Sequence, residues 1–376
     1  MNAPPAAVAV VFGGPSPEHD VSILTGLQVA RTLAGAGREV FGLYWSKTGG
    51  WYRLPAGLEA ADFLDGVPSA AEELRLSVGG AAGSSGFAER GGRLGRNRPV
   101  EIEVAVNCCH GGPGEDGSLQ AVFDLAGINY TGPGVAGAAL GMDKLAFAGL
   151  VVDAGLPALA RRLLGPSTSD PGFPGPYILK PRFGGSSLGI DVVADIGTAV
   201  ARLEANSHLR QGAVIEPYRP DLFDLNIAVR LWPAPALSAI ERPLRSTASA
   251  EILGYADKYV GAEGMASAPR ELPARLAAPL AEAIRSAALE IARLACVRGV
   301  ARIDFLSDGQ SWFVNEVNTV PGSLARYLWV EPPVSFLELI DALLDEARQR
   351  PTWRPNAMGA DGSVLRGAGG IAGKLG

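Results

Sequence analysis

The chain has 376 residues, 47% of them apolar and 19% charged, and its formal net charge of −6 comes with no basic run. This composition predicts a folded protein of two or three domains rather than a disordered chain, and it argues against a nucleic-acid or membrane-surface partner. The three cysteines form no even framework, the first residues lack the charged region of a signal peptide, and no 18-residue uncharged apolar run predicts a membrane span, so we expect a cytoplasmic protein.

The chain opens with the pattern of a strand–helix–strand unit. Val8–Phe12 is a continuous apolar run typical of a buried parallel strand, a helical pattern runs from about Val21 to Ala34, and Val40–Tyr44 is a second strand. Such units bind ligands at the carboxyl ends of their strands, and Glu18 stands just past the first one. Glu18 is therefore either a ligand contact or a first-turn acid favoured by the helix dipole. The GxGxxG fingerprint of nicotinamide-dinucleotide sites is absent.

A strand-end loop is the next candidate for binding. Residues 67–98 are rich in Gly, Ala and Ser and predict a mobile surface connection. Val104–Asn107 predicts a buried strand that runs into the loop His110-Gly111-Gly112-Pro113-Gly114-Glu115, whose glycines leave backbone N–H groups accessible to a ligand. The turn Gly132-Pro133-Gly134 marks the expected end of the first domain.

The second part of the chain contains a lysine-bearing strand followed by a Gly/Ser loop. A predicted helix over Val135–Ala154 carries Lys144, and the run Tyr177–Pro181 then predicts a strand. Lys180 lies within this apolar run, where a charge is costly unless it has an anionic partner. The loop Gly184–Gly189 follows, and its amides and hydroxyls could fold over a triphosphate. The pattern GxxxxGK[ST] is absent, which excludes a P-loop.

The third part leads to a predicted β-hairpin. A strand over Ala213–Glu216, a second strand from Asp221 to Arg230 and a helix over about Ala274–Leu294 precede two apolar runs, Arg302–Leu306 and Trp312–Val317. The Asp308-Gly309 turn signal between these runs favours a hairpin. Helix Val334–Gln349 closes the fold, and we expect a flexible tail over 350–376.

Polar side chains interrupt both hairpin strands. Because strand side chains alternate, Arg302 and Asp304 share one face of the first strand. In the same way Glu316 and Asn318 share one face of the second. The two carboxylates fall on a common face only if the connecting loop has an odd number of residues. In that case two carboxylates and a carboxamide form a patch of hard oxygen ligands that suits Mg²⁺. The alternative is the solvated polar face of an ordinary hairpin.

Taken together and in this order, several stretches resemble the D-alanine–D-alanine ligase family of the ATP-grasp superfamily. They are VFGGPSPEHDVS, HGGPGEDGSLQ, YTGPGV, MDK, ILKPRFGGSSLGI, YADKY, ARIDF and NEVNTVPG, and they cover residues 8 to about 330. The resemblance implies an α/β, three-domain ATP-grasp fold. An N-terminal Rossmann-like domain (1–133), a central subdomain (134–218) and a C-terminal subdomain with the Mg²⁺ site (219–349) would precede the tail, with ATP held between the last two.

The resemblance also implies the reaction. Such ligases join two D-alanines through an acyl phosphate, yielding a peptide bond, ADP and phosphate for peptidoglycan precursors. The expected cofactors are ATP and Mg²⁺, with two metal ions that Mn²⁺ could replace. The implied partners are small amino acids and a second copy of the chain, joined in a homodimer through the N-terminal domain.

The resemblance assigns three groups of residues to the nucleotide and the metal. The metal ligands would be Asp304, Glu316 and Asn318. The phosphates would be neutralised or covered by Lys144, Lys180, Lys258, Gly185, Ser186 and Ser187. Glu216 would begin the hinge that packs on adenine, and Asp224 stands where the family places a ribose-binding glutamate.

A further group of residues would handle the two amino acids. Glu18 would bind the ammonium of the first amino acid, tied to Ser186 and Tyr259. Arg302 and the amide of Gly322 would stabilise the tetrahedral oxyanion. His110 would sit by the first carboxylate, with Glu115 as the partner that orients it.

The most consequential of the departures from the family pattern lies in one segment. PGMTxxS becomes PGSLARY here, so Tyr327 stands where a serine would bind the second substrate's carboxylate. Arg326 is either a replacement contact for that carboxylate or a surface arginine. Two alternatives to D-alanine ligation therefore stay open. One is a sister ligase of a specialised pathway that takes a different amine, and the other is an ATP-binding protein without activity.

Overall fold

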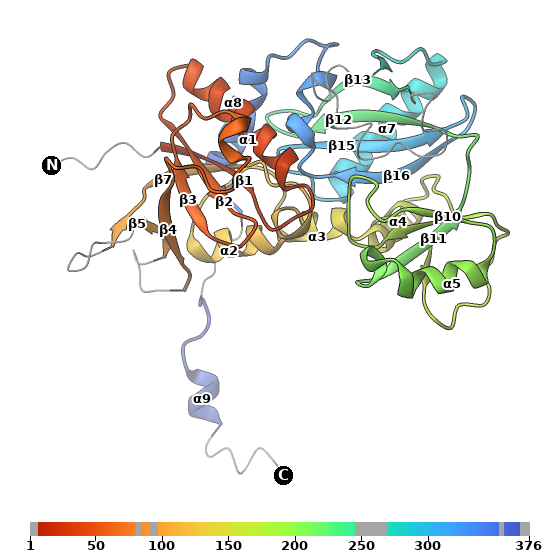
Figure 1. Ribbon diagram of the computed structural model, residues 1–376, viewed down its shortest axis with the longest axis horizontal. Coiled ribbons are helices and arrows are strands. Elements are labelled where there is room, and N and C mark those ends of the chain that lie inside the picture. Colours follow the sequence, from red (N-terminus) through yellow and green to blue (C-terminus); the bar gives the residue numbers. More distant parts are fainter. Residues whose placement is uncertain (1–6, 80–84, 90–96, 245–268, 353–356, 369–376) are drawn as a thin grey trace.

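The computed structural model describes residues 7–79, 85–89, 97–244, 269–352 and 357–368. The strands among these residues form three sheets, of seven, four and five strands. Figure 1 places the first sheet, in red to orange, at one end of the molecule, and the other two together at the opposite end. In the described part of the chain, no helix is both long enough and apolar enough to cross a membrane.

The N-terminal sheet confirms the predicted strand–helix–strand opening. Strand β1 (Ala7–Gly13) pairs in parallel with β2 (Val40–Trp45) and with β7 (Ile102–Asn107), and helix α1 (His19–Gly35) is the first crossover. The central residues of β1 are buried because helices cover the parallel strands, which explains the continuous apolar run. A short helix, α2 (Ser118–Ala126), follows the loop after β7.

The mobile connection predicted for residues 67–98 is wrong for the part that the structure describes. Four antiparallel strands extend the sheet in the order β3, β4, β5, β6; they are Trp51–Leu54, Glu72–Ser77, Gly86–Glu89 and Arg98–Pro99. Leu74 and Phe87 bury their side chains in the core under this extension. Glycine-rich stretches between the strands dominate the composition of residues 67–98, so the alternation of apolar and polar residues in the strands was not recognised. Residues 80–84 and 90–96 lie outside the described residues.

The helix predicted over Val135–Ala154 is two helices. Helix α3 (Val135–Met142) ends at Asp143, and α4 (Lys144–Asp153) begins with Lys144. The extended backbone of Asp143 (φ −83°, ψ 97°) breaks the helix, and its carboxylate accepts hydrogen bonds from the amides of Leu145 and Ala146. Such a cap satisfies amides that the first helical turn would leave unpaired.

The central sheet is antiparallel, in the order β10-β9-β11-β8. Its strands are β8 (Arg162–Leu164), β9 (Tyr177–Pro181), β10 (Asp191–Val193) and β11 (Ala213–Pro217), and helix α5 (Ile196–Ala205) covers one face. The predicted strands around Lys180 and Glu216 are thus confirmed, and they are direct neighbours in the sheet.

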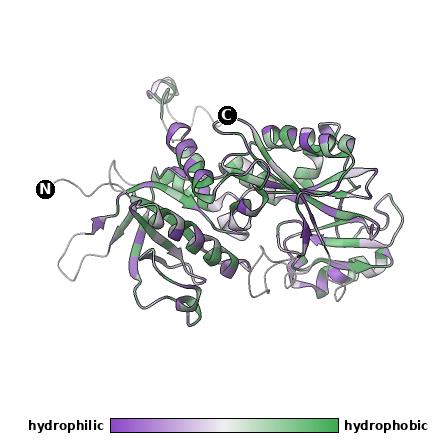
Figure 2. Ribbon diagram, turned by 90° about the horizontal axis from the view of Figure 1, so that it is seen from above, coloured by the Kyte–Doolittle hydropathy of each residue, from purple (hydrophilic) through white to green (hydrophobic). Residues whose placement is uncertain are grey.

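The C-terminal sheet has the order β14-β13-β12-β15-β16. Its strands are β12 (Phe223–Arg230), β13 (Ala236–Pro243), β14 (Arg270–Glu271), β15 (Val300–Ser307) and β16 (Trp312–Asn318). Helix α7 (Ala278–Leu294) packs on one face of this sheet. After the short helical segment η5 (Gly322–Leu328), which has left-handed φ at residues 323–325, helix α8 (Phe336–Gln349) returns to the core of the N-terminal sheet. Figure 2 shows that the surface helices carry both hydrophilic and hydrophobic residues.

The region expected to be a flexible tail is described only in part. Residues 357–368 contain a short helix, α9 (Ser363–Gly367), while 353–356 and 369–376 lie outside the described residues.

Candidate active site

The β15–β16 hairpin brings the two predicted carboxylates opposite each other. Asp304 pairs with Glu316, and Arg302 pairs with Asn318 one step along the same face. The loop is not odd, however, because Ser307 pairs with Trp312 and leaves residues 308–311 between them. A β-bulge at Asn315 adds one residue to β16 and restores the common face. The prediction that a common face requires a loop with an odd number of residues was therefore wrong. Asp304 and Glu316 nevertheless lie on a common face.

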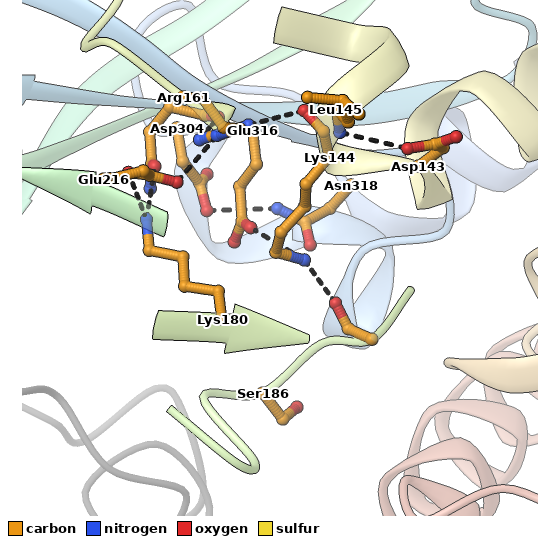
Figure 3. A network of polar contacts seen from close by, with 12 residues as sticks. Asp143, Lys144, Leu145, Arg161, Lys180, Ser186, Glu216, Asp304, Glu316 and Asn318 are labelled. Carbon is orange, nitrogen blue, oxygen red and sulfur yellow. Dashed lines mark hydrogen bonds and ion pairs between the residues drawn. The ribbon is translucent and has the colours of Figure 1, made fainter. Parts of the chain in front are cut away.

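These side chains form a compact patch of oxygen ligands and cations, shown in Figure 3. Arg302 binds Asp304 with two hydrogen bonds of 2.7 and 2.8 Å, and the Asn318 amide donates to Asp304 at 3.0 Å. The Lys144 ammonium lies 3.6 Å from the Glu316 carboxylate. Two facing carboxylates beside a carboxamide fit Mg²⁺, which binds oxygen. No cluster of three His, Cys, Asp or Glu that could hold a metal occurs in the described ranges, so such an ion would take its further ligands from water or a bound phosphate.

A second charged cluster surrounds Glu216 on β11. The Glu216 carboxylate is buried and lies 2.9 Å from the Lys180 ammonium and 2.6 Å from the Arg161 guanidinium. Burial alone would raise the pKa of Glu216, but Lys180 and Arg161 together hold that pKa below its usual value. Lys180 thus has an anionic partner within the protein itself. Because the cluster has two cations and one carboxylate, it retains a net positive charge that can attract an anionic ligand.

Arg161 is a central residue of the site that the sequence reasoning missed. Besides Glu216, its guanidinium binds the backbone carbonyls of Lys144 at 2.8 Å and of Asn315 at 3.1 Å. It therefore links the central sheet, helix α4 and the bulge of the β15–β16 hairpin (Figure 3). The only sequence signal was a pair of adjacent arginines before a short strand, which surface positions also produce.

The Gly/Ser loop reaches across to the N-terminal domain. Ser186 donates a hydrogen bond to Glu18, so the structure brings together the two described members of the triad that the resemblance implied. A side chain at Gly185 would place its Cβ 2.9 Å from the Glu18 carboxylate, which explains the glycine. Ser186 and Ser187 both have positive φ, at 52° and 59°, a strained conformation that is often found at functional sites. Tyr259 and Lys258 lie outside the described residues.

His110 is buried, but its orienting partner differs from the predicted one. Its Nδ1 is 2.7 Å from the carbonyl oxygen of Val320, and its Nε2 is 2.8 Å from the hydroxyl of Thr25. Burial lowers the pKa of His110 to about 4, so the ring is neutral at pH 7. The prediction that Glu115 orients this ring is wrong, because both ring nitrogens bind other groups.

Glu115 instead holds two backbone amides. Its carboxylate accepts hydrogen bonds from Gly111 N–H at 2.9 Å and from Val320 N–H at 3.1 Å. Burial, with Glu18 nearby, raises the pKa of Glu115 to about 7, and the two amides counteract part of that shift. Its role in the structure is therefore to tie the loop after β7 to the segment after β16.

Tyr327 occupies the end of the site beside Arg302. Its hydroxyl accepts a 3.4 Å hydrogen bond from Arg302, and the Arg270 guanidinium lies over its ring, 4.9 Å from the ring centroid. Arg270 also pairs with the buried Glu241 at 2.7 Å. Arg326, by contrast, is exposed and lies over the ring of Phe336, so the structure supports its interpretation as a surface residue.

One cleft of about 290 Å³ collects these groups. All the predicted site residues that the structure describes line it: Glu18, His110, Glu115, Lys144, Lys180, Gly185, Ser186, Ser187, Glu216, Asp224, Arg302, Asp304, Glu316, Asn318, Gly322 and Tyr327. They come from all three sheets and the loops that follow them. Such a cleft, in which lysines lie beside paired carboxylates, is suited to binding a nucleotide and a metal together.

Two family models and several characterised proteins match this sequence. Residues 7–133 match the family described as the D-ala D-ala ligase N-terminus, and residues 168–345 match the one described as the D-ala D-ala ligase C-terminus. The sequence is 32% identical to the D-alanine–D-alanine ligase of Corynebacterium aurimucosum, over 93% of this chain and 99% of that protein. It is 33% identical to that of a Methylobacterium species, over 91% of each.

Solved structures share the fold. The D-alanine-D-alanine ligase from Coxiella burnetii superposes with a TM-score of 0.74 at 20% identity, covering 99% of this chain and 100% of that one. The VanG D-Ala:D-Ser ligase from Enterococcus faecalis superposes with a TM-score of 0.72 at 23% identity, covering 91% of this chain and 99% of that one. At these identities the likeness concerns the fold.

Proposed function

Because the chain belongs to the D-alanine–D-alanine ligase family, we propose that it joins two D-alanines in an ATP-dependent reaction that supplies peptidoglycan precursors. In that reaction the first carboxylate takes the terminal phosphoryl group of ATP, which leaves ADP and an acyl phosphate. The amine of the second D-alanine then displaces phosphate and loses a proton. The observation that carries the proposal is the single cleft that unites Glu18 and Ser186 with the Asp304–Glu316 pair.

On the nucleotide side, the residues act through position and charge. Lys144 and Lys180 stand on the wall that would face the phosphates, and the Gly/Ser loop carries amides and hydroxyls beside them. Asp304, Glu316 and Asn318 would hold Mg²⁺, which neutralises phosphate charge when it is bound. Phosphoryl transfer needs little covalent chemistry from a protein, so positioning and electrostatics are the expected contribution of these residues.

On the amino-acid side, Glu18 would bind the ammonium of the first D-alanine while Ser186 holds the carboxylate of Glu18 in place. Arg302 and the Gly322 amide would stabilise the oxyanion of the tetrahedral intermediate. Both residues line the same part of the cleft as Tyr327, which bounds the space left for the incoming amine.

The test is phosphate release with ATP, Mg²⁺ and D-alanine, with the product identified by mass. We expect D-alanyl-D-alanine from the wild type. In Asp304→Asn we expect a loss of roughly 100-fold or more, because metal-assisted charge stabilisation contributes several kcal/mol and each 1.36 kcal/mol is tenfold in rate. Asp308→Asn is the matched control, since Asp308 lies in the exposed turn of the same hairpin.

Other outcomes of this assay would replace the proposal. Turnover that requires a second, different amine would identify a sister ligase whose amine site is rebuilt around Tyr327. ATP binding without turnover for any amino-acid pair would identify an inactive ATP-binding protein. Full activity in Asp304→Asn would place the metal elsewhere.

Family membership also supports a proposed setting for the enzyme. We propose a cytoplasmic homodimer that uses two Mg²⁺ ions, for which Mn²⁺ can substitute. The cysteine usage agrees with a reducing compartment, because Cys108, Cys109 and Cys296 are all free thiols and the first two are buried.

A further inference from the structure

Three side chains of the N-terminal domain hold the backbone on both sides of Gly322. Glu115 accepts from the N–H of Val320, His110 binds the carbonyl oxygen of Val320, and Thr25 accepts from the N–H of Ser323 at 3.1 Å. Gly322 lies within this clamped segment and lines the cleft. As the first residue of η5, its own N–H has no partner within that element.

The hydrogen bonds of His110 and Thr25 have a fixed direction. The carbonyl of Val320 can only accept, so Nδ1 of His110 carries the proton. In the neutral ring Nε2 is then an acceptor, and the Thr25 hydroxyl donates to it. Thr25 therefore uses its proton on His110 and its lone pair on Ser323 N–H. Thr25 is 1% exposed, and without its hydroxyl both His110 Nε2 and the N–H of Ser323 would lose this hydrogen bond.

The clamped segment leads into a strained stretch of backbone. Ser323, Leu324 and Ala325 all have φ near 50°, although none is glycine. Consecutive left-handed residues persist only where their surroundings over-determine them. Buried packing fixes Leu324 and Ala325, and the bond to Thr25 fixes the amide with which the stretch begins.

Helix α1 connects this clamp to the first-substrate end of the cleft. Thr25 lies seven residues after Glu18, which is about two helical turns, so both residues are on one face of α1. Ser22 on the same face binds the carbonyl of Cys108 at 2.8 Å and accepts from Gly13 N–H at 2.7 Å, which anchors the helix to β1 and to the loop after β7. Glu18 and the Thr25 hydroxyl are thereby held at a fixed separation.

We propose that Thr25 is a positioning residue that, through His110 and Ser323, sets the Gly322 amide where the oxyanion of the ligation reaction develops; this rests on the proposed function. A positioned donor contributes only when charge develops on the reacting oxygen. Thr25 would therefore act on the chemical step and leave ATP binding unaffected.

The experiment is a series of replacements at Thr25 that varies the hydroxyl group. Thr25→Ser keeps the hydroxyl, Thr25→Cys offers a weak donor, and Thr25→Val offers none. We expect kcat to fall in the order Ser, Cys, Val, with Ser within about 3-fold of the wild type and Val roughly 10- to 100-fold lower, because small misplacements of reacting groups cost up to about 100-fold. The KM for ATP should stay constant. Thr32→Val is the matched control, since Thr32 lies on the same helix and its hydroxyl donates to the Gln28 carbonyl, away from the clamped segment.

A second readout does not depend on activity. Amide hydrogen exchange of the 320–325 segment should be slow in the wild type and Thr25→Ser and faster in Thr25→Val, with the overall unfolding transition measured alongside. Equal protection and equal kcat in Thr25→Val would overturn the proposal, as would a lower stability with unchanged kcat. If the wild type forms no D-alanyl-D-alanine, the proposed function fails, while the exchange result still decides whether Thr25 positions the segment.

Discussion

Glu216 and its two cations show how single residues in this cleft depend on one another. The carboxylate is 1% exposed, and without it Lys180 and Arg161 would face each other in the interior with no counter-charge. Breaking a buried pair by removing one partner is costly, because the remaining charge stays desolvated. Exposed ion pairs are worth far less, since water and salt screen them.

We therefore predict that Glu216→Gln lowers the free energy of unfolding by about 3–5 kcal/mol. Urea denaturation at pH 7 measures the change. The control is Asp221→Asn, which removes one partner of the exposed Arg219–Asp221 pair and should cost less than about 1 kcal/mol. Similar values for the two variants would show that Glu216 does not hold the cluster together.

The same cluster shows what the sequence could reveal about single residues. A lysine inside an apolar strand signalled a buried cation that needs an anion, and Lys180 indeed has one. The sequence could not show that this anion is Glu216 on the adjacent strand, because pairing of β9 with β11 depends on the tertiary fold. Arg161 was missed for the same reason. Its partners Glu216 and Asn315 lie 55 and 154 positions away.

At the level of elements, the hairpin was predictable but its bulge was not. Alternation and the Asp308-Gly309 turn indicated two antiparallel strands, and both are present. The bulge at Asn315 is held by contacts from distant strands, since its side chain accepts from Lys180 at 3.3 Å and its carbonyl accepts from Arg161. Local sequence carries no signal for such contacts. The length of the loop alone left open whether the two carboxylates share a face, and the resemblance to the family indicated that they do.

The break between α3 and α4 places Lys144, and we predict a measurable consequence. Asp143 caps α4 and also binds Arg182 through two hydrogen bonds of 2.8 and 2.5 Å. Asp143→Ala removes both functions, so we expect stability to fall by about 1–2 kcal/mol and the KM for ATP to rise. Asp143→Asn keeps an oxygen for the cap and should lie between Ala and the wild type. An unchanged KM for ATP in Asp143→Ala would show that the cap does not position Lys144.

At the scale of the molecule, separate cores surround the cleft. One core joins the N-terminal sheet to α8 and η5, a second lies between α7 and the C-terminal sheet, and a small third one lies under the central sheet. Polar contacts join the central sheet and its Gly/Ser loop to the other two parts, such as Ser186 with Glu18 and Lys180 with Asn315. The sequence indicated three successive parts of the chain. It could not show that α8 returns to the first sheet, where Arg348 of α8 binds Glu103 of β7, 245 positions away.

His110 and Glu115 of the N-terminal part bind the backbone of Val320 in the C-terminal part. Burial shifts the pKa values of these two side chains in opposite directions. Burial lowers the pKa of His110 from 6.5 to about 4 and raises that of Glu115 from 4.5 to about 7. Between pH 4.5 and 6.5 the unfolded chain holds a proton on His110 and none on Glu115. The folded chain holds a proton on Glu115 and none on His110. The two states thus bind equal numbers of protons at this pair, and its contribution to stability is nearly independent of pH.

In a variant that lacks one of these two groups, the free energy of unfolding should depend on pH through the group that remains. In Glu115→Gln only the lowered pKa of His110 remains, so the unfolded state binds more protons than the folded state. The free energy of unfolding, expressed relative to the wild type, should therefore rise by about 2 kcal/mol as the pH increases from 4.5 to 6.5. In His110→Gln only the raised pKa of Glu115 remains, and stability should fall by about the same amount over that range. Urea unfolding at several pH values, with each variant compared with the wild type, measures both slopes. Parallel curves for all three proteins would show that neither group titrates abnormally, and slopes of the same sign would contradict the opposed shifts.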